Sequence, residues 1–249
     1  MDDVDRWGDH LRKASREAQG HPELLVLSSP IERLWARTIA LVFPARCALC
    51  DRIDTPLCKS CQERLNANTL SIRIKPPPPL NGAFASGYHD GELRRVVRTF
   101  KFSSDRYSAA ALAVYLSGRL ARILEHAQWK IDTLIPVPLH RERQYERGYN
   151  QSQLLALALA QRGAFDVSPN MLIRHRATRP QVGLSRADRL TNVENAFRAD
   201  PTLAAGRAVL LVDDVCTTGA TLAACAAALL EAGAARVYAV TVTAARGLL

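Results

Sequence analysis

The chain has 249 residues, of which 48% are hydrophobic, and a formal net charge of +9 at pH 7. This length and apolar content suit one α/β domain with a small appendage, and charged residues or glycines interrupt every apolar run well before the roughly 20 residues that a membrane span requires. The positive charge favours an anionic ligand, either a pyrophosphate or a nucleic acid. Because the first residues lack a basic secretory leader, we expect a cytoplasmic protein without a membrane span.

Residues 1–44 are predicted to form a helical leader. Their apolar residues between positions 31 and 42 are spaced like one face of a helix, and Ser28, Ser29 and Pro30 supply a start signal. We expect this face to pack on the next module.

Residues 45–75 contain four cysteines in two CxxC pairs, namely Cys47, Cys50, Cys58 and Cys61. Four thiolates can close a tetrahedral Zn²⁺ site, which would be structural because it leaves no coordination position open. The seven residues between the pairs are fewer than in a usual zinc ribbon, so disulfides and unligated thiols are the alternatives. A reducing compartment favours zinc. The prolines at 76–79 predict a stiff spacer and hence separable cores on its two sides.

Residues 76–249 alternate between strand and helix patterns, which predicts one domain with a central, mostly parallel sheet flanked by helices. The expected strands lie at 84–88, 131–137, 171–174, 209–212 and 236–243. The expected helices lie at 92–102, 105–126, 150–162 and 220–230. A long basic loop is expected to run from about residue 174 to residue 197.

The segment 209–222 is the most distinctive part of this domain. Its branched apolar residues predict a buried strand, and ligands of parallel α/β folds bind at the carboxyl ends of such strands. There Asp213 and Asp214 can accept hydrogen bonds from neighbouring sugar hydroxyls and are candidate magnesium contacts. The hydroxyl and N–H groups of the following loop can bind a phosphate, through Thr217, Thr218, Gly219, Ala220 and Thr221. The alternative is an ordinary strand end followed by a helix cap.

Two other segments are rich in arginine and could bind an anion such as pyrophosphate. After the strand at 131–137 the chain enters a rigid turn, Val137, Pro138, Leu139 and His140, followed by several arginines. The basic loop around Arg186 could close over a substrate and exclude water. Arginine suits the oxygens of a pyrophosphate, although these arginines could equally line solvated surfaces, and a lone His140 is more often a surface residue than an acid catalyst.

The segment 209–222 resembles the motif of type I phosphoribosyltransferases that binds phosphoribosyl pyrophosphate (PRPP). That resemblance implies that Asp213 and Asp214 bind the ribose hydroxyls, that residues 217–221 bind the 5′-phosphate, that residues 137–140 contact the diphosphate, and that Mg²⁺ accompanies PRPP. From about residue 45 onward the chain also resembles the ComF family, which is linked with natural competence and DNA uptake and has amidophosphoribosyltransferase-like members. The segments that carry this resemblance are Lys101-Phe102, 135–138, 147–151, Pro180-Gln181, 184–186 and the run after Asp213.

The expected chemistry is displacement of pyrophosphate at the anomeric carbon by an amine or a base nitrogen. It needs positioning and charge stabilisation, and no residue need act as a nucleophile. The acceptor has no recognisable motif. The alternative is a non-catalytic competence factor in which single-stranded DNA binds the basic residues Arg94, Arg95 and Arg98 and stacks on Tyr145 and Tyr149.

Overall fold

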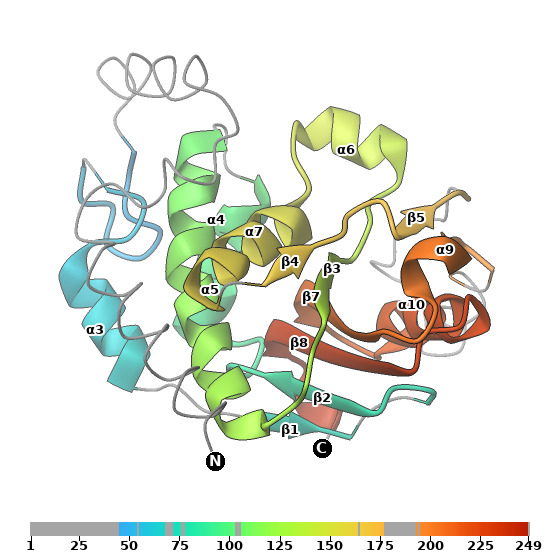
Figure 1. Cartoon of the computed structure of the whole chain (residues 1–249). Coiled ribbons are helices and arrows are strands. Elements are labelled where there is room, and N and C mark those ends of the chain that lie inside the picture. Colours follow the sequence, from blue (N-terminus) through green and yellow to red (C-terminus); the bar gives the residue numbers. More distant parts are fainter. Residues whose placement is uncertain are drawn as a thin grey trace.

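The computed structural model describes residues 45–53, 55–67, 72–75, 78–102, 106–163, 165–176, 193 and 195–248. The predicted leader at 1–44 and the loop that contains Arg186 therefore lie outside the described residues. Within the described part, a sheet runs through the centre and helices cover both of its faces (Figure 1). The predicted α/β class is confirmed.

The central sheet has six strands in the order β1-β2-β8-β7-β3-β4. Strand β1 is antiparallel to β2, and the other neighbouring pairs are parallel. Most side chains of β7 and all but the first of β8 are buried, because both faces of these central strands are covered. The strands are β1 (Ile72–Ile74), β2 (Gly82–Ala85), β3 (Thr133–Pro136), β4 (Asp166–Val167), β7 (Ala208–Cys216) and β8 (Arg236–Ala244).

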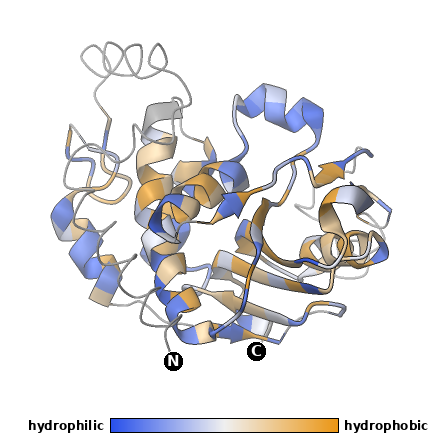
Figure 2. Cartoon of the chain, viewed as in Figure 1, coloured by the Kyte–Doolittle hydropathy of each residue, from blue (hydrophilic) through white to orange (hydrophobic). Residues whose placement is uncertain are grey.

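The two faces of the sheet have separate hydrophobic clusters. One face is covered by α4 (Gly91–Phe102), α5 (Arg106–Ala127) and α7 (Gln151–Gly163). The other face is covered by α9 (Pro201–Ala204), α10 (Ala220–Glu231) and a hairpin of β5 (Leu172–Arg174) and β6 (Phe197–Ala199). Two short helices, α6 (Arg141–Arg147) and η2 (Arg246–Leu248), follow β3 and β8. Figure 2 shows hydrophobic residues concentrated in the central strands and hydrophilic residues on α6.

The four helices predicted in this domain are confirmed as α4, α5, α7 and α10. The strand predicted at 84–88 is shifted, since β2 spans Gly82–Ala85 and only an isolated bridge joins Tyr88 to Ala244. Beyond β2 the chain instead makes single backbone hydrogen bonds to the end of β8, from Ser86 N to Thr241 O at 3.1 Å and from His89 N to Ala244 O at 2.8 Å. The strand therefore passes into a tethered loop before α4 begins.

The cysteine module does not have the separable core that the proline spacer predicts. Cys47, Leu57 and Leu65 belong to the same hydrophobic cluster as Val96 and Leu116 of α4 and α5. A module of about 30 residues buries too little apolar surface to form a core of its own, so it completes its burial against the larger domain. Its helix α3 (Lys59–Ala67) lies outside α5 in Figure 1. The division into domains at residue 76 stays a prediction.

Candidate functional site

The two described site segments lie side by side at the carboxyl edge of the sheet. Strands β3 and β7 are neighbours in parallel register, with Pro136 opposite Val212. The N–H of Val137 donates to the carbonyl of Val212 at 3.1 Å, and Asn150 Nδ2 donates to the carbonyl of Val137 at 3.1 Å. The turn at 137–140 therefore begins beside Asp213. Arg186 lies outside the described residues.

The carboxylate of Asp213 faces the start of α7. Ser152 Oγ donates to Asp213 Oδ1 at 2.8 Å, and the same oxygen accepts the N–H of Asp214 at 2.9 Å. Burial, and after it the neighbouring charge of Asp214, raises the pKa of Asp213 to about 7. Ser152 was missed by the sequence analysis, because its place in the first turn of a helix gives no signal of a partner 61 residues away.

Asp214 is only 6% exposed and is paired with a cation from another layer of the fold. Lys101 Nζ, in the last turn of α4, lies 2.9 Å from Asp214 Oδ1. A buried carboxylate needs such compensation, since an unpaired charge would be costly away from water. Sequence analysis quoted Lys101 only for the family resemblance and gave it no role at the site.

The loop after β7 has the backbone geometry of an anion cradle. Gly219 caps the N-terminus of α10 with φ of 78°, a left-handed conformation that residues with a Cβ rarely adopt. Thr218 Oγ1 accepts the N–H of Ala220 at 3.3 Å. Thr217 is exposed, whereas Thr218 and Thr221 are half-buried. Because the 12-residue α10 begins here, the positive end of its dipole also faces this loop.

Arginines gather near the two aspartates. Burial lowers the pKa of Arg147, while the nearby charge of Asp214 acts in the opposite direction. Burial also lowers the pKa of Arg174, with Arg143 and Arg176 close enough to add repulsion and Asp213 close enough to oppose it. A group of cations that repel one another beside a site is ready to accept a multiply charged anion.

His140 and two nearby tyrosines differ in their surroundings. His140 is at the N-cap position of α6 without a side-chain capping hydrogen bond, and its Nδ1 lies 3.5 Å from Glu142 Oε2, a carboxylate exposed to solvent. Tyr149 is buried, and its hydroxyl donates to the carbonyl of Phe100. The idea that Tyr149 stacks on bases is therefore wrong, because its ring is a packing element between α7 and α4. Tyr145 on α6 is 91% exposed and stays available.

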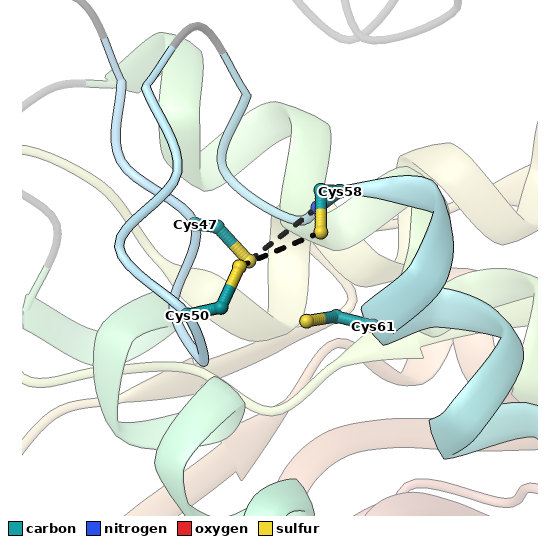
Figure 3. Close-up of side chains that lie close together, drawn as sticks. All are labelled: Cys47, Cys50, Cys58 and Cys61. Atoms are coloured by element: carbon teal, nitrogen blue, oxygen red, sulfur yellow. Dashed lines mark hydrogen bonds between the residues drawn. The ribbon is translucent and has the colours of Figure 1, made fainter.

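The four cysteines of the N-terminal module converge on one point (Figure 3). Their sulfur atoms all lie within 4.8 Å of one another, and Cys50 Sγ is 3.6 Å from Cys58 Sγ. Four sulfurs bound to one Zn²⁺ at about 2.3 Å must sit at comparable separations, so the donor set fits that ion. The hydroxyl of Ser60 is the largest cause that lowers the pKa of Cys58, to about 6. The cluster could hold a metal ion.

A hollow of about 950 Å³ opens elsewhere, between the β5–β6 hairpin and the end of α10. Its lining includes Ile173, His175, Arg198 and Glu231, and none of the predicted site residues. The acidic pair and the anion loop are chemically more specific than this mixed lining, so the candidate site is the one at the carboxyl edge of β7. No helix in the described ranges is both long enough and apolar enough to cross a membrane.

Comparison with known proteins gives a family match and several curated relatives. Residues 110–247 match the family model described as "Phosphoribosyl transferase domain". The chain is 32% identical over 194 residues to the DNA utilization protein YhgH of Shigella flexneri, covering 77% of this chain and 85% of that protein. It is 34% identical over 177 residues to Competence protein F of Haemophilus influenzae, covering 67% and 75%. Competence protein ComFC of Bacillus subtilis is 29% identical over 189 residues, covering 75% and 72%.

Proposed function

The chain belongs to the ComF family of phosphoribosyl transferase domain proteins, and from that premise we propose that it binds PRPP with Mg²⁺ and transfers the phosphoribosyl group to an amine or a base nitrogen. The observation that carries this proposal is the arrangement of three groups at one sheet edge. Asp213 and Asp214 lie near the carboxyl end of β7, which continues past the expected strand at 209–212 to Cys216. The Gly219 loop then leads into α10, and Val137 directly follows the neighbouring strand β3.

Each group suits a different part of PRPP. The carboxylates of Asp213 and Asp214 accept hydrogen bonds from the ribose 2′ and 3′ hydroxyls, and the loop at 217–221 binds the 5′-phosphate through backbone N–H and hydroxyl groups. The turn at 137–140 and the arginines near it receive the diphosphate. The ionised carboxylate of Asp213 is the stronger acceptor for the diol, so its raised pKa links binding to pH.

In the reaction, the bond between C1′ and the diphosphate oxygen breaks and its electron pair leaves with pyrophosphate. The acceptor nitrogen forms the new bond to C1′. Residues of the chain act by positioning the two reactants and by stabilising the developing charges, with no covalent intermediate. Carboxylate and phosphate oxygens are the ligands that Mg²⁺ prefers, so Asp213, Asp214 and PRPP itself fit this ion, which would neutralise charge on the leaving group.

Calorimetry with Mg²⁺ and PRPP tests the binding step. Changing both aspartates, Asp213→Asn and Asp214→Asn, removes two charged acceptors and is expected to cost on the order of 1.5–3 kcal/mol for each lost hydrogen bond. The matched control is Asp166→Asn, at an exposed carboxylate on β4 near the opposite edge of the sheet. Unchanged affinity in a folded double variant would overturn the proposal.

Ribose 5-phosphate has the 5′-phosphate of PRPP but no diphosphate, so its binding distinguishes the proposed 5′-phosphate position from the proposed diphosphate position. Thr218→Val removes a hydroxyl from the cradle and is expected to weaken both ribose 5-phosphate and PRPP. Arg186→Ala, if the basic loop closes on diphosphate, is expected to weaken PRPP and to spare ribose 5-phosphate. An equal loss of both ligands in Arg186→Ala would contradict this division of roles.

A second candidate function is the binding of single-stranded DNA without turnover. Arg94 and Arg98 are exposed on the outer face of α4, and Tyr145 offers an exposed ring on α6. Phosphates and bases of a single strand bind such cations and rings. The names of the relatives refer to DNA utilization and competence. Pyrophosphate release with ammonia, glutamine or free nucleobases distinguishes transfer from DNA binding alone.

For the cysteine module we propose a structural Zn²⁺ bound by Cys47, Cys50, Cys58 and Cys61. The convergence of the four sulfur atoms supports this role. Four thiolates fill the tetrahedral coordination of Zn²⁺ and leave no position for a substrate, as is typical of structural sites. The ion would stabilise the start of α3, which carries Cys61 in its first turn.

A further inference from the structure

His89 lies at the same sheet edge as the aspartates, in the loop between β2 and α4. Besides its backbone bond to Ala244, two contacts hold this loop against the end of β8. Arg246 Nη2 is 2.7 Å from Asp90 Oδ2, and the Arg246 guanidinium lies 4.4 Å from the centre of the Tyr88 ring. The backbone of His89 is thus fixed on both sides, which is a condition for a side chain that must be placed accurately.

The imidazole of His89 is oriented by a buried threonine. His89 Nδ1 lies 2.8 Å from Thr243 Oγ1, and the Thr243 hydroxyl donates to the carbonyl of Asp214 at 3.4 Å. With the hydroxyl proton of Thr243 assigned to the carbonyl of Asp214, the hydroxyl oxygen accepts the Nδ1 proton of His89. This arrangement selects the tautomer whose Nε2 carries a free electron pair.

The order of the strands indicates which reactant approaches His89. Under the proposed function the diphosphate lies at the end of β3 and the ribose at the end of β7. In an in-line displacement at C1′, the nucleophile enters from the side opposite the leaving group. In the sheet order β2-β8-β7-β3, that side is the end of β8 and β2, where Thr243 and His89 lie.

We propose that His89 Nε2 accepts the proton that the incoming amine or base nitrogen loses as it bonds to C1′. This inference rests on the proposed function. As the nitrogen–carbon bond forms, the bond from C1′ to the diphosphate breaks with its electron pair, and the proton passes from nitrogen to Nε2 and then to solvent. Thr243 is a positioning residue, since it acts only through the ring of His89.

The electrostatic surroundings keep His89 unprotonated near neutral pH. Burial lowers its pKa first, and the charges of Lys101 and Arg94 on α4 lower it further. Asp214 on β7 and Asp90 in the same loop act in the opposite direction without cancelling this effect. A base must be unprotonated to accept a proton, so these surroundings suit the role.

The test uses the full-length protein and compares His89→Asn with the unaltered chain. The amide of Asn can still donate to Thr243 Oγ1 but has no basic nitrogen in place of Nε2. Calorimetry measures the affinity for PRPP with Mg²⁺, and pyrophosphate release is measured with ammonia and with each free nucleobase. We expect unchanged PRPP affinity, a decrease in kcat of about 100-fold, and partial recovery when imidazole is added to His89→Ala.

Two further variants separate chemistry from folding. Thr243→Val, which keeps the shape of a fully buried side chain, is expected to lower kcat less than His89→Asn does. The control is His126→Asn on the last turn of α5, where Nδ1 contacts the carbonyl of Arg122, and it is expected to change nothing. Normal pyrophosphate release by His89→Asn would overturn the role of His89 alone. No release by the unaltered protein with any acceptor would overturn both that role and the transferase reaction.

Discussion

Arg119 Nη1 donates a hydrogen bond of 3.0 Å to the backbone carbonyl of Leu65, which joins α5 to the last turn of the cysteine module's helix. The same guanidinium donates to Ser86 Oγ at 3.1 Å and to the Ser86 carbonyl at 2.8 Å. Arg119 is 1% exposed, so all of these bonds are shielded from water. One buried side chain therefore links α3 to the loop that carries His89.

We predict that Arg119→Met lowers the free energy of unfolding by about 2–4 kcal/mol, because it removes the buried hydrogen bonds to Leu65 and Ser86. Urea denaturation measures the change. The matched control is Arg122→Met on the same helix, which removes an exposed guanidinium that contacts Asn66 and should cost less than about 0.5 kcal/mol. Equal stability of the two variants would contradict a linking role for Arg119.

Metal removal is predicted to destabilise more than the cysteine module. Elemental analysis should find one zinc per chain, and Cys58→Ser or Cys61→Ser should abolish it. Because the module shares a hydrophobic cluster with α4 and α5, a chelator should also increase hydrogen exchange in those helices. Cys225→Ala, at a buried thiol in α10, should keep the full metal content. Zinc-free protein purified without a chelator would rule out this assignment.

Asp213 is predicted to reduce the stability of the unliganded protein as the pH rises. Its pKa is about 7 in the folded state against an ordinary value of 3.8, so between these values the folded state binds more protons than the unfolded state. The contribution to stability therefore falls from about pH 4 to pH 7 and is constant above that. Asp213→Asn should be more stable than the unaltered protein at pH 8, on the order of 2 kcal/mol, with a smaller difference at pH 5. Urea midpoints at the two pH values check the sign.

Single-stranded DNA binding is predicted to depend on Arg94 and Arg98 and to weaken steeply with salt, because phosphate neutralisation releases counterions. Replacing both residues by Gln should reduce affinity and the salt slope. Arg95 is a poor choice for this test, since its Nη2 donates to the Leu49 carbonyl at 3.1 Å and helps to dock the cysteine module. We expect partial competition between DNA and PRPP. Salt-independent binding, or none, would exclude this function.

The sequence predicted those parts of the site that are continuous along the chain. The strand that contains Asp213, the loop at Gly219 and the helix after it are adjacent in sequence, and each is specified by local residue preferences. The two CxxC pairs were recognisable for the same reason. Their convergence on one point needs only a short loop, which the spacing allows.

The partners of these residues were decided by the tertiary structure alone. Lys101 reaches Asp214 from α4, Ser152 reaches Asp213 across 61 residues, and His89 reaches Thr243 across 154. Such contacts depend on strand order and on which face each crossover helix covers, and neither property is encoded in local periodicity. The sequence by itself determined the acidic pair, the anion loop and the four thiols. Only the packing of α4 and α7 on the sheet decided which cation and which hydroxyl meet the acidic pair, and only the pairing of β2 with β8 brought His89 to the same edge. These groups come together only when the whole sheet has formed.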